Sequence, residues 1–196
     1  MARYKEEQSK HIREARRIQI LNAALRVFAE YGVEGTKMSM IAKAADLSHG
    51  LMYHYFESKE ELLTHSLLWA MEGADQLIEE VRASSANPLD KIAHFTRSAI
   101  SAGSHDVFRM IQSCMKHPDL DEETKNLISQ TSEKYVSLLV PIVIEGQHRE
   151  EMIKEDPEML ANLYLTILSG LIADDVNWLH QNLDWNIRML LRVIQK

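Results

Sequence analysis

The 196-residue chain is poor in residues that cross-link a protein or carry it through a membrane. Cys114 is the single cysteine, which excludes an intrachain disulfide and a zinc site built from cysteines. No run of eighteen apolar residues occurs, so no membrane span is expected. The charged first residues also lack the apolar core of a signal peptide. These absences predict a soluble, cytoplasmic protein.

Motifs of enzymes and of metal sites are missing as well. The sequence contains no G-x-S-x-G elbow, Walker loop, H-E-x-x-H helix or glycine-rich dinucleotide turn. Cys114 lies in the run SCMKH, which activates a thiol only weakly, and a buried structural thiol is the commoner role. His94, His105 and His117 do not have the spacing of metal ligands on one helix. We therefore expect no enzyme, no cofactor and no metal.

The formal net charge of −7 at first argues against a nucleic-acid partner. Its distribution weakens that argument, because residues 1–65 carry ten Lys and Arg against nine Asp and Glu, whereas residues 66–196 carry twelve against twenty. The first seventeen residues hold six Lys and Arg against three Glu. DNA binding needs a local basic surface, not a basic protein. Residues 1–11 are predicted to form a basic N-terminal arm, although a charged tail in solvent would have the same composition.

With seven glycines and four prolines, the chain is poor in the residues that form tight turns between strands. No segment shows sustained alternation of apolar and polar residues, which would be typical of strands. Apolar residues instead recur at three-to-four spacing, which is typical of amphipathic helices. Gly32 and Gly146 are predicted to end helices, and Pro141 to kink one. The fold class is therefore all-α, with about nine helices. They are expected at 12–31, 36–45, 48–56, 58–83, 89–102, 106–116, 122–145, 157–179 and 183–194.

The stretch from Thr36 to Leu62 has the pattern of two short helices joined by a tight turn and followed by a capped helix. Ser48 can cap the second short helix, and Ser58 with Glu61 forms an S-x-x-E capping box. The second helix exposes small, polar and aromatic residues where a core helix would show an apolar stripe. This is the arrangement in which a helix-turn-helix offers its recognition helix to the major groove of DNA.

This region resembles the DNA-binding domain of the TetR family of bacterial regulators. The resemblance covers residues 12–65 and rests on Ile41-Ala42-x-x-Ala45, Leu47-Ser48-x-Gly50 and Tyr53-His54-Tyr55-Phe56-x-Ser58-Lys59-x-x-Leu62, with Ala23-Ala24, Phe28-Ala29-x-x-Gly32 and Thr36 upstream. It implies a trihelical DNA-binding domain, residues 12–60, on a helical ligand-binding and dimerisation bundle, residues 61–196.

Two positions depart from the family's pattern. Asp46 stands in the turn where the family usually has glycine, at a position that often needs a positive φ. Asp tolerates that conformation better than most residues, so the turn is expected to survive. His49 stands where Lys or Arg is frequent, which removes a fixed positive charge and can make contacts there sensitive to pH.

The DNA-contacting residues are predicted around the second helix of the motif. Ser48 and the first amides of its helix face phosphate or groove, while His49 and His54 can reach base edges. By resemblance, Tyr53 and Lys59 contact phosphate. The predicted set is Lys37, Ser39, Ser48, His49, Gly50, Tyr53, His54 and Lys59. Tyr55 and Phe56 are expected to pack inside.

One recognition helix reads only a few base pairs, so a homodimer on a palindromic operator is expected. Its interface is predicted at Leu160, Leu163, Tyr164, Ile167, Leu171, Trp185 and Leu190, although these residues would also fit a monomer core. An effector pocket is predicted among the methionines and aromatics of the body, at Trp69, Phe95, Phe108, Met110, Tyr135, Asp174 and Trp178, where ordinary core packing is the alternative. Asp174 and Asp175 would favour a cationic ligand, or are simply exposed carboxylates at a helix end.

Together these features predict a dimeric repressor that an unknown small-molecule inducer releases from DNA. The inducer would shift the long helix 58–83 and so change the spacing of the two DNA-binding domains. An activator, or a helical protein-interaction adaptor, is the alternative. The sequence identifies neither the inducer nor the operator.

Overall fold

The computed structural model describes residues 2–101, 104–117, 120–174 and 176–196. All regular structure in these ranges is helical, which confirms the predicted fold class, and a lone bridge between Met152 and Gln195 is the one β-type pairing in them. The helices are α1 Ala2–Gly35, α2 Met38–Ala44, α3 His49–Met52, α4 Lys59–Ala83, α5 Pro88–Ile100, α6 Ser104–Met115, α7 Glu122–His148, α8 Pro157–Asp174, α9 Val176–Gln181 and α10 Leu183–Leu191. None of the helices in the described part of the chain is long and apolar enough to cross a membrane.

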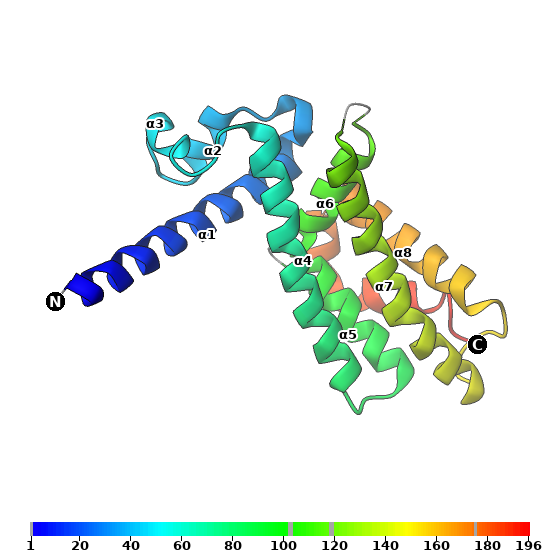
Figure 1. The fold of residues 1–196 in the computed structure, drawn as a ribbon. Helices are drawn as coiled ribbons and strands as arrows, with labels where there is room; N and C mark the ends of the chain where they lie inside the picture. Colours follow the sequence, from blue (N-terminus) through cyan, green and yellow to red (C-terminus); the bar gives the residue numbers. More distant parts are fainter. Residues whose placement is uncertain (1, 102–103, 118–119, 175) are drawn as a thin grey trace.

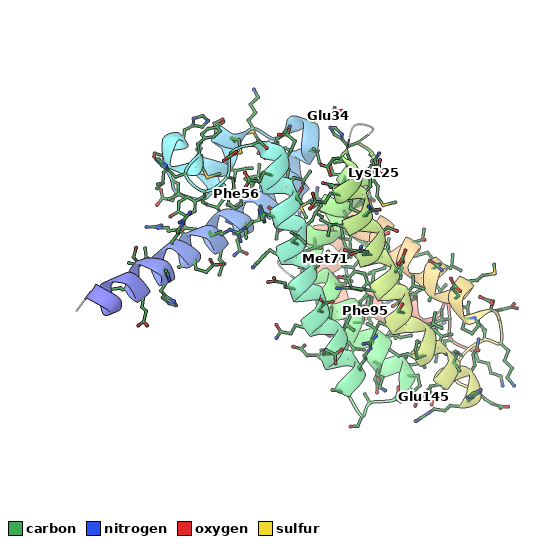
Figure 2. The ribbon with its side chains drawn as sticks, viewed as in Figure 1. Glu34, Phe56, Met71, Phe95, Lys125 and Glu145 are labelled. Carbon is green, nitrogen blue, oxygen red and sulfur yellow. The ribbon has the colours of Figure 1, made fainter. Side chains whose placement is uncertain are left out.

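Two regions are visible in Figure 1, a small head formed by α1–α3 and a larger body formed by α5–α10, with α4 running from one into the other. Each region has its own cluster of buried apolar side chains. Phe56 belongs to the head cluster and Phe95 to the body cluster (Figure 2). The head cluster extends into the body, because Met110 and Cys114 of α6 and Ile128 of α7 belong to it.

The first helix is longer than predicted, since α1 begins at Ala2 and not near residue 12. The predicted start followed the apolar periodicity, and the first buried residue is indeed Ile20. Residues 2–19 contain neither Gly nor Pro, so nothing in their backbone chemistry stops the helix from extending past the core. Residues 7–16 are all exposed, and this part of α1 projects away from the body (Figure 1).

The two predicted helix-ending glycines behave differently. Gly32 takes the predicted left-handed conformation, with a φ of +72°, but it kinks α1 and does not end it, because the helix runs on to Gly35. Gly146 lies within α7, which runs on to His148, so that prediction was wrong. Gly146 is instead required by packing, because a Cβ on it would lie 2.5 Å from the sulfur of the buried Met152. The positive φ after α7, +58°, belongs to Glu150.

Two further differences concern the body. The predicted helix 157–179 is divided into α8 and α9, and Asp175 between them lies outside the described residues, as do residues 118–119 before α7. The helix α7 continues through Pro141, whose side chain is exposed.

Candidate nucleic-acid interface

The turn between α2 and α3 is built by a helix-ending hydrogen-bond pattern. The amide of Leu47 donates to the carbonyl of Ala42 at 2.9 Å, and the amide of Asp46 to the carbonyl of Lys43 at 3.2 Å. This is a Schellman motif, in which the first residue after the helix cap takes the left-handed conformation and is usually glycine. Asp46 occupies that position with a φ of +54°, which confirms the expectation that the turn keeps its geometry without glycine.

The recognition helix α3 is short but well capped. The Ser48 hydroxyl accepts the amide of Leu51 at 3.3 Å, as its predicted cap role requires. Helix-like bonds continue after α3, since Tyr55 and Phe56 both donate to the carbonyl of Met52. Met52 and Phe56 are buried against the head cluster and Tyr55 is half-buried, so the inward side of this segment holds the rest in place.

The outward side carries the predicted DNA-binding residues. Seven of the eight are exposed, namely Lys37, Ser39, Ser48, His49, Gly50, Tyr53 and His54, and Lys59 is half-buried. Tyr53 is 47% exposed, and its ring packs edge-on against His49 at 5.1 Å between centroids. A Cβ on Gly50 would meet nothing within 4 Å, so a second surface could approach its backbone closely.

A shallow groove of about 440 Å³ lies between α2 and α3, lined in part by Ser39, Ser48 and His49. Lys43 also lines this groove, and the sequence interpretation missed it. Its place one residue before the end of α2 and its exposure leave a positive charge beside the recognition helix.

Lys59 differs from the other seven because its ammonium is bonded within the head. It donates to the carbonyl of Val33 at 2.9 Å, which fastens the start of α4 to the end of α1. An ammonium has three donors, so this bond leaves two for another acceptor. Half of the predicted capping box forms at this helix start, since Ser58 accepts the amide of Glu61 at 3.0 Å, whereas the Glu61 carboxylate accepts the amide of Glu57.

Two residues of α1 that the sequence did not single out contact the helix-turn-helix motif. The side-chain amide of Gln19 donates to the carbonyl of Ala45 at 2.6 Å, at the turn itself. Arg17 lies over the Phe56 ring at 5.4 Å from its centroid and contacts a His65 ring nitrogen at 2.9 Å. No sequence motif marks these contacts, because they join residues at least 26 positions apart.

The head is bonded to the body at the end of α1. The hydroxyl of Ser113, on α6, accepts the amide of Val33 at 3.2 Å, so Val33 is held by α6 through its N–H and by Lys59 through its carbonyl. A second link joins the hydroxyls of Thr64 on α4 and Thr124 on α7 at 3.2 Å. The end of α1 is therefore bonded both to α6 and to the start of α4.

An open cavity of about 1210 Å³ lies beside this junction, with walls from α1, α4, α5, α6 and α7. Of the predicted pocket residues, Trp69, Phe108 and Tyr135 line it. Phe95 lies behind them, with its ring 5.5 Å from that of Tyr135, while Met110 is buried in the head cluster. Asp174 and Trp178 do not line this cavity, so a role for them in effector binding stays a prediction, and Asp175 lies outside the described residues.

The cavity also has charged walls that the sequence interpretation missed. Arg26 and Arg109 line it together with Glu30, Glu72, Glu80, His105 and Asp106. Nε2 of His105 lies 3.1 Å from a carboxylate oxygen of Asp106, and both side chains are mostly buried. The described residues hold no group of three or more possible metal ligands.

Cys114 is buried between the head and the body. Burial raises the pKa of its thiol to about 12, so the thiol stays protonated near neutral pH. A protonated, buried thiol is a poor nucleophile.

Helix α8 has two apolar faces, which explains its excess of apolar residues. Leu160 and Tyr164 belong to the inward face, where the Tyr164 hydroxyl lies 2.6 Å from that of Thr96. With Leu190 of α10 they are buried in the protomer's own core and cannot reach a partner, so these three were wrongly assigned to an interface. The outward face carries Met159, Leu163, Ile167 and Leu171 at four-residue spacing, with Trp185 of α10 also exposed. Met159 is 71%, Leu163 48% and Trp185 50% exposed.

Comparisons with known proteins agree with this architecture. Residues 20–65 match the model of the bacterial regulatory proteins of the tetR family. Over 143 residues the chain is 31% identical to the fatty acid metabolism regulator protein of Bacillus subtilis (strain 168), a match that covers 70% of this chain and 71% of that protein.

Two solved structures share the fold. The ketosteroid regulator KstR2 of Mycobacterium tuberculosis superposes with a TM-score of 0.72 at 21% identity, covering 92% of this chain and 95% of that one. AibR, solved with isovaleryl coenzyme A and operator DNA, gives a TM-score of 0.64 at 24% identity and covers 81% of this chain and 94% of that one. The head motif, the helical body and the curated relative together show that the chain belongs to the TetR family of bacterial DNA-binding transcriptional regulators.

Proposed function

We propose that the protein is a homodimeric repressor that binds a palindromic operator and leaves it when a small molecule enters the 1210 Å³ cavity. The observation that carries this proposal is the set of exposed polar side chains on α3 and on the residues that flank it, presented by a Schellman turn and a buried base.

Each exposed side chain has a role that follows from its chemistry. His49 and His54 are the side chains able to exchange hydrogen bonds with base edges. Tyr53, Lys37 and Lys43 contact phosphates, which fix the register of the helix on the duplex. Lys59 keeps its bond to Val33 and offers its remaining donors to a phosphate.

Two recognition helices need a rigid separation of about one helical turn of DNA, about 34 Å. The outward face of α8, with Trp185, is the surface that we assign to the dimer. Exposed apolar residues at this spacing are removed from water when the same face of a second copy covers them. Leu163, Ile167, Leu171 and Trp185 therefore remain in the proposed interface.

For the effector we propose an acyl thioester of coenzyme A. Its acyl group would contact Trp69, Phe108 and Tyr135, and its phosphates would lie near Arg26 and Arg109. The cavity volume exceeds the range of about 300–1,000 Å³ typical of small-molecule sites, which suits a long ligand. AibR, which has the same fold, was solved with such a thioester.

Release of DNA would follow from the walls of the cavity. A ligand there contacts α6 at Phe108 and Arg109, one turn before Ser113, which holds Val33 of the head. It also contacts α4, which begins at Lys59 in the head. A ligand that favours another position of either helix moves α3 relative to its partner, and the two heads then no longer fit the two half-sites.

The DNA-binding half of the proposal is tested by selecting operator duplexes from a random library with the full-length protein. Tyr53→Phe removes one exposed hydroxyl and should weaken binding to the selected duplex severalfold, while Tyr31→Phe, an exposed tyrosine on α1, is the matched control. Failure to enrich any sequence would overturn the repressor proposal and favour a protein-interaction adaptor. Equal affinity of the two variants would remove only the role of Tyr53.

The effector half is tested with isovaleryl coenzyme A, coenzyme A and free isovalerate. At a hundred times its dissociation constant, a ligand raises the free energy of unfolding by about 2.7 kcal/mol, which raises the Tm of a chain this size by about 5–10 °C. The thioester should raise the Tm by this amount and release the selected duplex. It should bind the Arg109→Gln variant more weakly than the Arg149→Gln variant. A shift with free isovalerate but not with the thioester would refute this effector class.

A further inference from the structure

Residues 7–16 of α1 pack against no other element in the described part of the chain. Residues 7–16 are all exposed, and Ile12 is 58% exposed, so this segment buries no apolar face in the protomer. Most helical stability in proteins comes from packing against other elements, and a lone helix of this length is only marginally stable in water. A second surface is therefore expected to cover it.

The charge of the segment indicates what that surface is. The first seventeen residues hold six Lys and Arg against three Glu. Lys10 and Arg13 are exposed, and neither forms an ion pair with any residue in the described part of the chain. Arg16 is exposed as well, and its guanidinium is hydrogen-bonded to Gln19, at 2.8 Å. At 100° per residue, the positions 10, 13 and 16 lie within about 120° of the helix circumference.

The segment leaves the head at the recognition turn. Gln19 donates to the carbonyl of Ala45, and Arg17 packs on Phe56, so α1 is fixed to the motif just where its exposed part begins. From residue 19 back to residue 2 the helix is about 25 Å long. Figure 1 shows it projecting on the side of the head opposite to α8, which places it away from the proposed dimer axis.

We infer that the α1 extension, residues 2–16, is a second DNA-binding element that contacts phosphates on the outer flank of each half-site. The double helix carries one phosphate charge for about every 1.7 Å of its axis, so an element about 25 Å long with unpaired cations meets several of them. These contacts add affinity and register and read no bases. The inference rests on the proposed binding of operator DNA and enlarges its footprint.

The test compares the wild type with the double variant Lys10→Gln/Arg13→Gln, using a duplex of about four helical turns, roughly 42 bp, that the wild type selects. Both side chains are exposed, and glutamine is a good helix former, so the fold should be unchanged, as circular dichroism would verify. The slope of log affinity against log salt should flatten by about 0.9 for each phosphate that the variant no longer neutralises, up to about 3.6 for the two extensions of a dimer. Hydroxyl-radical protection should disappear at the outer edges of the footprint and persist at its centre.

The matched control is Arg149→Gln/Lys154→Gln, which removes the same charge from exposed positions after α7. It should leave slope and footprint unchanged, and the swap Lys10→Arg/Arg13→Lys should retain both. A double variant with the wild-type slope and footprint would overturn the inference while leaving the repressor proposal intact. A double variant whose oligomeric state differs from that of the wild type in the absence of DNA would also overturn the inference, because the extension would then contact a second copy of the chain. A wild type that binds no duplex would instead overturn the proposed function.

Discussion

Replacing Ser113 by alanine tests whether the hydrogen bond between α6 and Val33 couples the cavity to the DNA-binding head. The Ser113 hydroxyl accepts the Val33 amide at 3.2 Å, and Val33 is 6% exposed. Loss of the Ser113 hydroxyl leaves the largely buried amide of Val33 without an acceptor, which costs about 1–2 kcal/mol. For a chain of this size the Tm should fall by about 2–8 °C.

The effect of Ser113→Ala on the coupling between effector and operator DNA should be larger than this change in stability alone would give. About 1.4 kcal/mol corresponds to a tenfold change in an equilibrium constant, so the effector-induced change in operator affinity should shrink by up to about tenfold. Affinity is measured by fluorescence anisotropy with and without the effector. Ser132→Ala is the control, because the Ser132 hydroxyl bonds to the carbonyl of Ile128 in its own helix. If both variants kept the wild-type coupling, the bond from α6 to Val33 would not transmit the signal.

Three further perturbations follow from the geometry. Asp46→Gly should change the free energy of unfolding by less than about 1 kcal/mol, because relief of the positive φ offsets the flexibility of glycine. Asp46→Val should lower the free energy of unfolding by about 1–2 kcal/mol more and weaken DNA binding. Equal stabilities of the two variants in urea would contradict this reasoning. Cys114 should react with a thiol reagent only after unfolding. The pKa of its thiol is about 12 in the folded chain and about 9 in the unfolded chain. The difference in free energy of unfolding between wild type and Cys114→Ala should therefore be largest below pH 9 and decline as the pH rises towards 12. Rapid labelling of the native protein at pH 8 would refute the burial. The Thr96 hydroxyl donates to the carbonyl of Ile92, so we assign Tyr164 as the donor to Thr96. Tyr164→Phe should then cost about 1 kcal/mol and Thr96→Val more, because only Thr96→Val leaves a buried hydroxyl without its partner. The reverse order by thermal unfolding would refute this donor assignment.

The local features of the head were predictable because each depends on neighbours in sequence. The cap at Ser48 and the turn at Asp46 involve hydrogen bonds over three to five residues, and the sequence shows both partners. The positive φ of Gly32 is local for the same reason. The inward orientation of Phe56 also followed from its spacing within the motif.

Features that depend on distant residues were not predictable. The helical state of residues 2–11 has no apolar signal, and Gly146 looked like a helix end although its need for glycine comes from Met152 packing on it. The outward and inward faces of α8 are both apolar, so the pattern could not tell Leu163 from Tyr164. Which face a helix buries is decided by the helices that pack on it.

Helix α1 brings the parts of the proposed mechanism onto one element. Its extension carries Lys10 and Arg13, its middle holds the recognition turn through Gln19, and its next turns line the cavity at Leu25 and Arg26. It kinks at Gly32, just before Val33, which α6 holds. The sequence had suggested α4 as the lever that carries the signal. In this geometry an effector in the cavity contacts α1 two turns from the bond that positions the recognition helix, so a shift of α1 reaches α3 without passing through α4.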